Sequence, residues 1–339
     1  MAAANCKSRK RLGLQSSLHG VMLAFNHSAS NWPTFSLLGI PGLEAAHIWI
    51  SIPFCLLYTL ALAGNALLLV LVRAEQNLHA PQFYFLAVLA LTDLGLSLST
   101  LPSVLAIFWF DVRRIGLDAC LSQMFFIHTL SSVESGVLVA MAFDRLVAVC
   151  APLNYTRILT RHTVAWLSGA ALIRGATLLA PLPFVLRAFP FCGATGLSHS
   201  YCYYPDVLNL ACGDVSVSSA YGLGFVLCTF ATDALFILAS YVKILGTLLK
   251  LGPPGRTWKA LHTCACHLCT VCVFYLPLLS LAVLHRYTHH TSPVLYSTMS
   301  DAYLLVTPLL NPLVYSLKSQ QIQAALRKRF GVQRVVAGE

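Results

Sequence analysis

Seven long apolar segments recur along the chain, and short polar connections separate them. Each segment is longer than the roughly 20 apolar residues that a membrane-spanning helix requires. A β-barrel would instead alternate polar and apolar positions over about ten residues. The pattern therefore predicts an all-α membrane protein, a seven-transmembrane helix bundle without a second folded domain. The expected spans are Ile48 to Val72, Gln82 to Phe110, Leu121 to Val149, Thr163 to Leu186, Val217 to Leu249, Ala260 to Leu284 and Val294 to Leu317.

Composition agrees with a lipid environment. The chain has 339 residues, of which 57% are hydrophobic and only 10% are charged, whereas soluble domains carry about 25% charged residues. The formal net charge of +10 raises the question of nucleic acid as a partner. The basic residues, however, lie in short connections between apolar runs, without a basic domain or interleaved aromatic residues. We therefore expect membrane lipid, and no nucleic acid, around this protein.

Basic residues decide the expected orientation. They gather in the connections on one side of the bundle, at Arg73, Arg145 and Lys259 and again near the carboxyl end. The positive-inside rule assigns that side to the cytoplasm. Seven spans then leave the amino terminus outside, where the sequon that begins at Asn26 can be glycosylated. The expected location is the plasma membrane, with several spans crossing it.

The predicted spans divide the chain into three parts. Residues 1–47 form an extracellular amino-terminal segment, residues 48–317 form the seven-span bundle, and residues 318–339 form a cytoplasmic amphipathic helix and tail. Two interpretations stay open for the basic stretch 1–21. It is either a dispensable extension ahead of a start at Met22 or a disordered extension that crosses the membrane.

Four cysteines fall on the expected outer side, where the environment is oxidising and disulfides form. They are Cys120, at the start of the third helix, and Cys192, Cys202 and Cys212, in the long loop before the fifth helix. Four thiols allow three pairings, and their spacing does not choose among them.

Polar residues near the middle of four spans predict an interior cluster. A carboxylate at this depth costs several kcal/mol unless it faces the bundle interior and has a partner. Asn65, Asp93, Glu134 and Asn311 lie at a common depth on helices one, two, three and seven. Two readings are open, because the two carboxylates can share a sodium ion or one of them can be protonated. No other cofactor or metal is expected.

Residue spacing on the third helix sets a scale of depth, since an α-helix rises 1.5 Å per residue. Cys120 and Arg145 are then about 37 Å apart, which places the cysteine at the outer surface and the arginine at the inner one. Glu134 and Arg145 lie on the same interior face. His128 lies about 12 Å below Cys120, where a small molecule from outside can reach it.

Taken together, these residues resemble the odorant receptors, across roughly residues 32 to 330. The opening FSLLGIPGLE and the pair His285 and Arg286 resemble the class I, fish-like branch of that family. The resemblance rests on six motifs in order: GN at Gly64, LHAPQFYFL from Leu78, LTDL around Asp93, MAFDRLVAVC from Met141, KALHTCACHL from Lys259 and PLLNPLVYSL from Pro308.

This resemblance implies a rhodopsin-like G-protein-coupled receptor with a short amphipathic helix after the seventh span. A small odorant would bind from outside, and a heterotrimeric G protein of the stimulatory olfactory type would bind inside. The family's disulfides would pair Cys120 with Cys202 and Cys192 with Cys212.

The resemblance also implies a switch at the inner end. Arg145 would be held by Asp144 at rest and released to meet the G protein. Pro312 would let the seventh helix bend, and Tyr315 would swing towards the arginine.

Two residues suggest the chemistry of the ligand. Arg286, at the outer end of helix six, and His128 could together hold an anion, because a charge-assisted hydrogen bond is roughly twice as strong as a neutral one. A volatile of about eight heavy atoms bound at micromolar affinity needs about 8.2 kcal/mol, which apolar contacts alone would strain to supply. We therefore expect polar odorants such as aliphatic carboxylic acids, with the tail among Phe125, Leu278 and Leu281. Alternatively, Arg286 extends to the lipid headgroups and His128 is a satisfied interior histidine.

Five positions depart from the usual pattern of the odorant receptors. Leu146 replaces a tyrosine after the DR pair and removes a hydroxyl from the coupling surface. Asp301 replaces an asparagine and adds an acid to helix seven. Gln82, Phe83 and Thr307 depart from the motifs of helices two and seven.

Other classes of function fit the sequence less well. A chemoreceptor outside the nose, or another rhodopsin-like receptor, would share the fold. A transporter would show an internal repeat or paired broken helices, and the sequence has neither. We expect no enzyme, because the chain contains no nucleophile elbow, Walker loop or HExxH motif.

Overall fold

The computed structural model describes residues 33–40, 42, 47–192, 195–250, 254–287 and 293–331, and in 254–263, 266, 282–287, 293 and 318 it describes the backbone alone. Long helices form seven rods, and each contains one predicted span in full, so the predicted fold class is confirmed. The rods are α2 (His47–Ala74), α3 (Pro81–Phe110), α4 (Leu117–Cys150), α6 (Arg161–Leu179) with α7 (Pro181–Ala188), α9 (Ser216–Val226) with η4 (Leu227–Ala231) and α10 (Thr232–Lys250), α11 (Pro254–Tyr287), and α12 (Pro293–Lys318).

Length and apolar composition alone identify most of these rods as membrane spans. In the described chain, four qualify: α2, α3, α6 with α7, and α9 through α10. A fifth is α4, if it is counted with the segment Pro152–Ile158, which bends from it by 117°. In α11 the side chains are described without a gap over His267–Leu281, and this stretch is apolar. Buried polar side chains, including Asp301 and Asn311, lower the mean hydropathy of α12.

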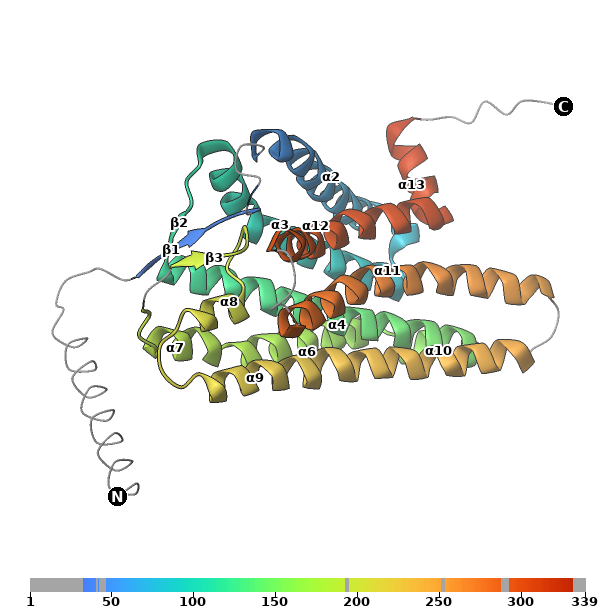
Figure 1. Ribbon diagram of the computed structural model, residues 1–339. Coiled ribbons are helices and arrows are strands. Elements are labelled where there is room, and N and C mark those ends of the chain that lie inside the picture. The colour runs from blue at the N-terminus through green and yellow to red at the C-terminus, as the bar shows by residue number, and fades with distance from the viewer. Residues whose placement is uncertain are drawn as a thin grey trace, which may run out of the picture.

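A small sheet that the sequence analysis did not predict covers one end of the bundle (Figure 1). Its central strand is β1 (Thr34–Leu37), which pairs antiparallel with β2 (Arg114–Gly116) and parallel with β3 (Gly196–Leu197). Two rods separate β1 from β2 along the chain, and four separate β1 from β3. Hydrogen-bonded strands must lie at the same end of the bundle. Of each two intervening rods, one therefore runs away from this end and the other runs back to it.

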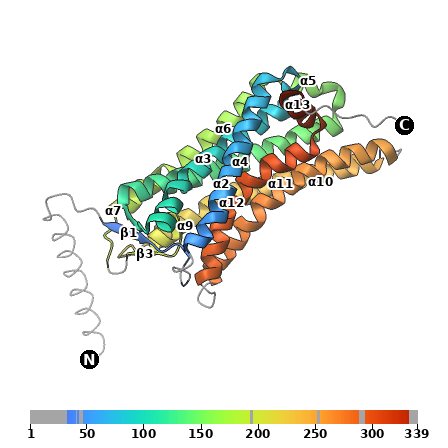
Figure 2. The ribbon, with the colours of Figure 1, turned by 90° about the horizontal axis from the view of Figure 1, so that it is seen from above.

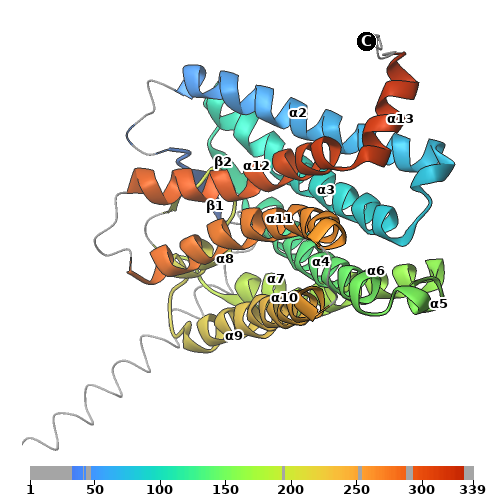
Figure 3. The same cartoon turned by 90° about the vertical axis from the view of Figure 1, so that its right-hand side faces the viewer.

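At the centre of the bundle lies α4, which packs against α3, α6, α10 and α11. Figure 3 shows α2 and α3 on one side of it and α9 with α10 on the other. The core has two main clusters, one towards the strands that includes Phe35 and Met124, and one towards the opposite end that includes Phe85 and Ile322. This arrangement lets side chains of α4 meet partners from most of the other rods.

The end opposite the strands carries two short connections and the last helix. Here lie η2 (Gln76–Leu78), η3 (Pro152–Asn154), α5 (Tyr155–Ile158) and α13 (Gln320–Phe330), and Figure 2 shows α5 and α13 away from the strands. Ser319 caps α13 by accepting a hydrogen bond from the Ile322 amide at 3.4 Å. Lys328 Nζ lies 2.8 Å from Glu75 Oε2 beside η2, so α13 is tied to the first connection.

Candidate functional site

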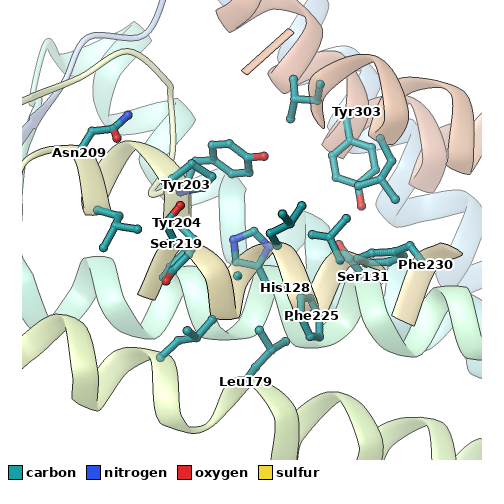
Figure 4. Close-up of a pocket in the computed structure, with 18 residues that line it drawn as sticks. His128, Ser131, Leu179, Tyr203, Tyr204, Asn209, Ser219, Phe225, Phe230 and Tyr303 are labelled. Carbon is teal, nitrogen blue, oxygen red and sulfur yellow. The ribbon is translucent and has the colours of Figure 1, made fainter. Parts of the chain in front are cut away.

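A cavity lies between α4, α9 and the loop helix α8 (Tyr204–Asn209), and Figure 4 shows its lining. It contains about 1050 Å³ of space, part of it open to solvent, and its wall is mainly apolar. The lining residues are His128, Ser131, Leu179, Leu182, Tyr203, Tyr204, Pro205, Leu208, Asn209, Ser219, Gly222, Leu223, Phe225, Val226, Phe230, Leu278, Leu281 and Tyr303. A cavity of this size, with a few polar groups, suits a small and mostly apolar ligand.

His128 is the polar group placed most centrally in this cavity (Figure 4). Its ring lies 5.8 Å from the ring of Tyr203, measured between centroids. The Nε2 atom is buried and has no hydrogen-bond partner in the described part of the chain. A buried polar atom without a partner costs about 1–3 kcal/mol. A ligand that hydrogen-bonds His128 would therefore satisfy an atom that the protein leaves open.

The other predicted ligand residues fall in three places. Leu278 and Leu281 line the cavity from α11. Phe125 is not among the lining residues, and its ring makes an edge-to-face contact with Phe126 at 5.7 Å. The side chain of Arg286 lies outside the described residues. Among the described side chains, no Arg or Lys lines the cavity.

Two disulfides hold the loop that contains α8 over this cavity. Cys120 at the start of α4 is bonded to Cys202, and Cys192 is bonded to Cys212 within the loop. The backbone amide of Cys202 also donates to Gln123 Oε1 at 2.9 Å. The loop is therefore fixed to α4 covalently and by a hydrogen bond.

The same loop is tied to α12 through Asp301, one of the departures from the family pattern. Ser200 Oγ donates to Asp301 Oδ2 at 3.0 Å, and the hydroxyls of Tyr201 and Ser300 are hydrogen-bonded. The loop residues in these contacts are buried. The acid on helix seven thus has a partner in the loop and helps to hold it in place.

A polar network that the sequence pattern did not predict lies below the cavity and joins four rods. The guanidinium of Arg174 on α6 makes two hydrogen bonds of 2.7 Å to the carboxylate of Asp233 on α10. Ser135 Oγ on α4 donates to Asp233 Oδ2 at 2.6 Å and lies 2.8 Å from Tyr275 Oη on α11. Arg174 and Asp233 stand inside predicted apolar runs, so the rule that such charges seek partners could have found them.

Backbone geometry next to Asp233 is also unusual. The π-helical turn η4 lies between α9 and α10 and ends two residues before Asp233. Such turns add a residue to the helix and often occur at functional sites. Phe230 in this turn lines the cavity, so the same turn shapes the binding space and precedes the ion pair.

Three of the four predicted interior polar residues meet directly. Asn311 Nδ2 donates to Asp93 Oδ2 at 3.0 Å and to Glu134 Oε1 at 3.3 Å. Asn65 instead donates to the Pro308 carbonyl at 2.8 Å, which fixes it beside α12. The structure thus brings Asp93, Glu134 and Asn311 together and places Asn65 against the neighbouring turn of α12.

The side-chain oxygen atoms in and beside this cluster are suitable ligands for a hard cation. Oδ1 atoms of Asn65, Asp93 and Asn311 are buried without a hydrogen-bond partner in the part of the chain that the structure describes. Carboxylate and amide oxygens are the ligands that hard cations prefer. Two carboxylates this close in apolar surroundings also require a cation or a shared proton. Residues of this cluster therefore fit a sodium ion.

At the inner end of α4, Asp144 and Arg145 form an ion pair that other residues surround. Arg145 Nε lies 2.9 Å from Asp144 Oδ2, and Tyr155 Oη donates to Asp144 Oδ1 at 2.8 Å. Burial and the Asp144 carboxylate raise the pKa of Tyr155, which keeps its phenol a donor. Arg145 also donates to Gln82 Oε1, so this departure from the family pattern supplies a partner for the arginine.

The other two predicted switch residues, Pro312 and Tyr315, lie on α12. Pro312 packs so closely on α2 that a Cβ at Gly64 would lie 3.1 Å from Pro312 Cγ. Tyr315 is buried in the core cluster at this end. Leu146 stands where the family has a tyrosine. It packs against the small cluster that contains Ile244 and Leu248, and so joins α4 to α10 by apolar contact.

Comparison with known proteins identifies the family of this chain. A profile of the olfactory receptor family matches residues 54–333. The human olfactory receptor 51G2 is 47% identical over 305 residues, covering 90% of this chain and 97% of that receptor. Human olfactory receptor 51L1 is 44% identical over 310 residues, which cover 91% of this chain and 98% of that receptor.

The fold agrees with a solved structure as well. The crystal structure of squid rhodopsin superimposes with a TM-score of 0.67 and covers 86% of this chain and 87% of its own, at 16% sequence identity. The fold is therefore rhodopsin-like. Because the family profile and relatives with more than 40% identity both span most of the sequence, the chain belongs to the olfactory receptor family, in its class I branch, and is not an enzyme.

Proposed function

We propose that this receptor binds a small polar odorant in the cavity beside His128. The open hydrogen-bonding atom of His128 in a largely apolar space supports this proposal. An aliphatic carboxylic acid would place its head group between His128 and Arg286 and its tail against Leu278 and Leu281. The apolar wall supplies most of the binding free energy, and the head group supplies the specificity.

The receptor carries this signal across the plasma membrane with its amino terminus outside and its carboxyl terminus in the cytoplasm. The odorant binds at the end that carries the strands, and a stimulatory olfactory-type G protein binds at the end that carries Asp144 and Arg145. Activation separates this ion pair and raises cyclic AMP. Bending at Pro312 brings Tyr315 towards the freed arginine.

Two segments have supporting roles in this proposal. Asn26 in the segment 1–47 carries a glycan on the outer side. The amphipathic helix α13 (Gln320–Phe330) lies along the inner leaflet, where each basic residue near anionic lipid contributes about 1 kcal/mol.

Replacing His128 or Arg286 tests the ligand class. In cells that make the full chain, aliphatic acids are expected to raise cyclic AMP more than the matched alcohols and aldehydes do. His128→Ala is expected to raise the half-effective concentration about tenfold or more, which is about 1.4 kcal/mol. Arg286→Ala should remove the preference for acids. Arg187→Ala is the control, because this arginine pairs with Asp118 at 3.1 Å and does not line the cavity.

Two outcomes would count against this function. An unchanged preference for acids in Arg286→Ala would exclude the carboxylate proposal. If no odorant raised cyclic AMP in cells with the receptor at their surface, the signalling proposal would also be wrong.

If a sodium ion binds between Asp93 and Glu134, the thermal stability of the receptor depends on which cation the buffer contains. We expect the purified receptor to melt at a higher temperature in sodium chloride than in choline chloride of equal concentration. A tenfold excess of sodium over its dissociation constant contributes about 1.4 kcal/mol. Asp93→Asn should abolish the difference, and the exposed control Asp118→Asn should keep it. Equal melting of the unmodified receptor in both salts would show that a shared proton, and not sodium, neutralises the pair.

A further inference from the structure

We infer that ligands reach the cavity from the lipid, through the wall formed by α9 beside α6 and α7. This inference rests on the proposed odorant-binding function and concerns the route to that site. At the end of the bundle that carries the strands, the disulfide-bonded loop is fixed to α4 and α12, and the sheet lies beside it. Phe35 on β1 and Leu197 on β3 are both only 1% exposed, so the sheet packs closely onto the loop and helices below.

On its side along α9, the cavity is walled by this single helix. Ser219, Gly222, Leu223 and Val226 all line the cavity from this helix. Leu223 lines the cavity and is nonetheless 36% exposed, so this side chain is the barrier that the proposed route has to pass. Beside it, Gly222 adds only backbone to the wall. Tyr204 of the loop leaves no room for a side chain at this position, because a Cβ at Gly222 would lie 2.6 Å from Tyr204 Cε1.

This thin wall lies at the depth of the hydrocarbon. Leu223 is seven residues beyond the first residue of α9, which places it about 10 Å further into the bundle. The polar headgroup zone occupies only about 5–8 Å of each leaflet. On the opposite edge, Leu179 and Leu182 line the cavity, and Phe184 on α7 is exposed. The proposed passage is therefore flanked by apolar side chains that favour lipid.

A tyrosine bridges the same wall. Tyr221 Oη donates to the Leu178 carbonyl at 2.5 Å, which joins α9 to the last turn of α6. Carbonyls in the last turn of a helix lack intrahelical partners, so this hydrogen bond satisfies one of them. The Tyr221 side chain is 39% exposed, and losing the bond would cost little burial. Tyr221 therefore sets the width of the passage, and Leu223 blocks it.

A route through lipid favours apolar ligands before any contact with the receptor. Each methylene adds about 0.8 kcal/mol to the transfer of a solute from water into an apolar phase. The bilayer thus concentrates small odorants next to the passage. A second route is available in principle, because Asn209 and Ser219 line the cavity at its water-exposed edge. The two routes differ in which reagents they admit.

Thiol labelling separates the routes without a known odorant. Ser131→Cys places a reporter on the α4 wall, in a full-length receptor whose exposed cysteines Cys228, Cys269 and Cys272 are serine. Membranes are treated with N-alkyl maleimides of increasing chain length or with a charged, membrane-impermeant methanethiosulfonate, and the modified reporter is counted by mass spectrometry. The same receptor without the reporter gives the background rate.

Expected rates follow from the lipid route. Maleimide labelling should rise about fourfold with each added methylene, the fold-change equivalent to about 0.8 kcal/mol. Leu223→Trp should slow it about tenfold and Tyr221→Phe should speed it severalfold. Leu235→Trp is the matched control, because Leu235 on α10 is 64% exposed and does not line the cavity, and it should leave the rate unchanged.

The charged reagent provides the opposing outcome. If it modifies the reporter as fast as the maleimides do, and Leu223→Trp changes neither rate, the ligand enters from water and the inference is wrong. Labelling does not depend on signalling, so a receptor that fails to raise cyclic AMP can still show the lipid route. Conversely, a signalling receptor with water-side labelling would overturn the route and leave the proposed function standing.

Discussion

Asp233→Asn is expected to remove most of the receptor from the cell surface. The substitution leaves the guanidinium of Arg174 without its charged partner between the helices. Removing one member of a buried ion pair costs about 3–5 kcal/mol, because the remaining charge stays desolvated. Asp233 also accepts the hydrogen bond from Ser135 that leads to Tyr275 on α11. The loss therefore loosens contacts among four rods.

Surface labelling of intact cells and thermal unfolding of the purified receptor measure this effect. Replacing both charges, in Arg174→Leu with Asp233→Leu, should restore much of the surface level, because paired hydrophobic side chains can replace a buried ion pair at little cost. Asp214→Asn is the control, since this acid is exposed near the start of α9. Normal surface level and melting temperature in Asp233→Asn would show that the network does not stabilise the bundle.

Loss of the Cys120–Cys202 disulfide is expected to be more damaging than loss of Cys192–Cys212. The first bond joins residues 82 positions apart and the second joins residues 20 positions apart. Closing the longer loop removes more entropy from the unfolded chain, about 4.5 kcal/mol against about 3.3 kcal/mol. The first bond also joins the loop to α4, whereas the second lies within the loop.

Cys120→Ser and Cys192→Ser, compared by surface labelling and by the concentration dependence of the odorant response, test this order. Cys120→Ser should abolish both signals. Cys192→Ser should keep a measurable surface fraction with a weaker response, because α8 remains anchored through Cys202. Cys55→Ser is the control, since Cys55 forms no disulfide. Equal losses in the two variants would contradict the loop-length argument.

The seven rods were predictable because a helix in lipid must satisfy its own backbone and expose apolar side chains over its whole length. The sheet was not predictable in this way. Its strands have four, three and two residues, too few for an alternating pattern, and their pairing depends on contacts between distant segments. For the same reason, spacing left the pairing of the outer cysteines open.

Interior charges were predictable only in part. Asp93 and Glu134 stand out because a carboxylate in an apolar run needs a partner, and Asn311 does join them. The same reasoning applies to Arg174 and Asp233, which were missed although each is the other's partner. Gln82 could not be interpreted from its sequence motif, because its contact with the arginine of α4 depends on how two helices pack.

The position of β1 also constrains how the receptor is made and how it can be modified. This strand is synthesised before the other two, because β2 follows it after two rods and β3 follows it after four rods. Until residues 196–197 are delivered, β1 has an unpaired edge that can join a foreign strand. A purification tag or reporter fused upstream should therefore leave Thr34–Leu37 free to pair. Fusions that truncate this strand should trap immature receptor during biosynthesis.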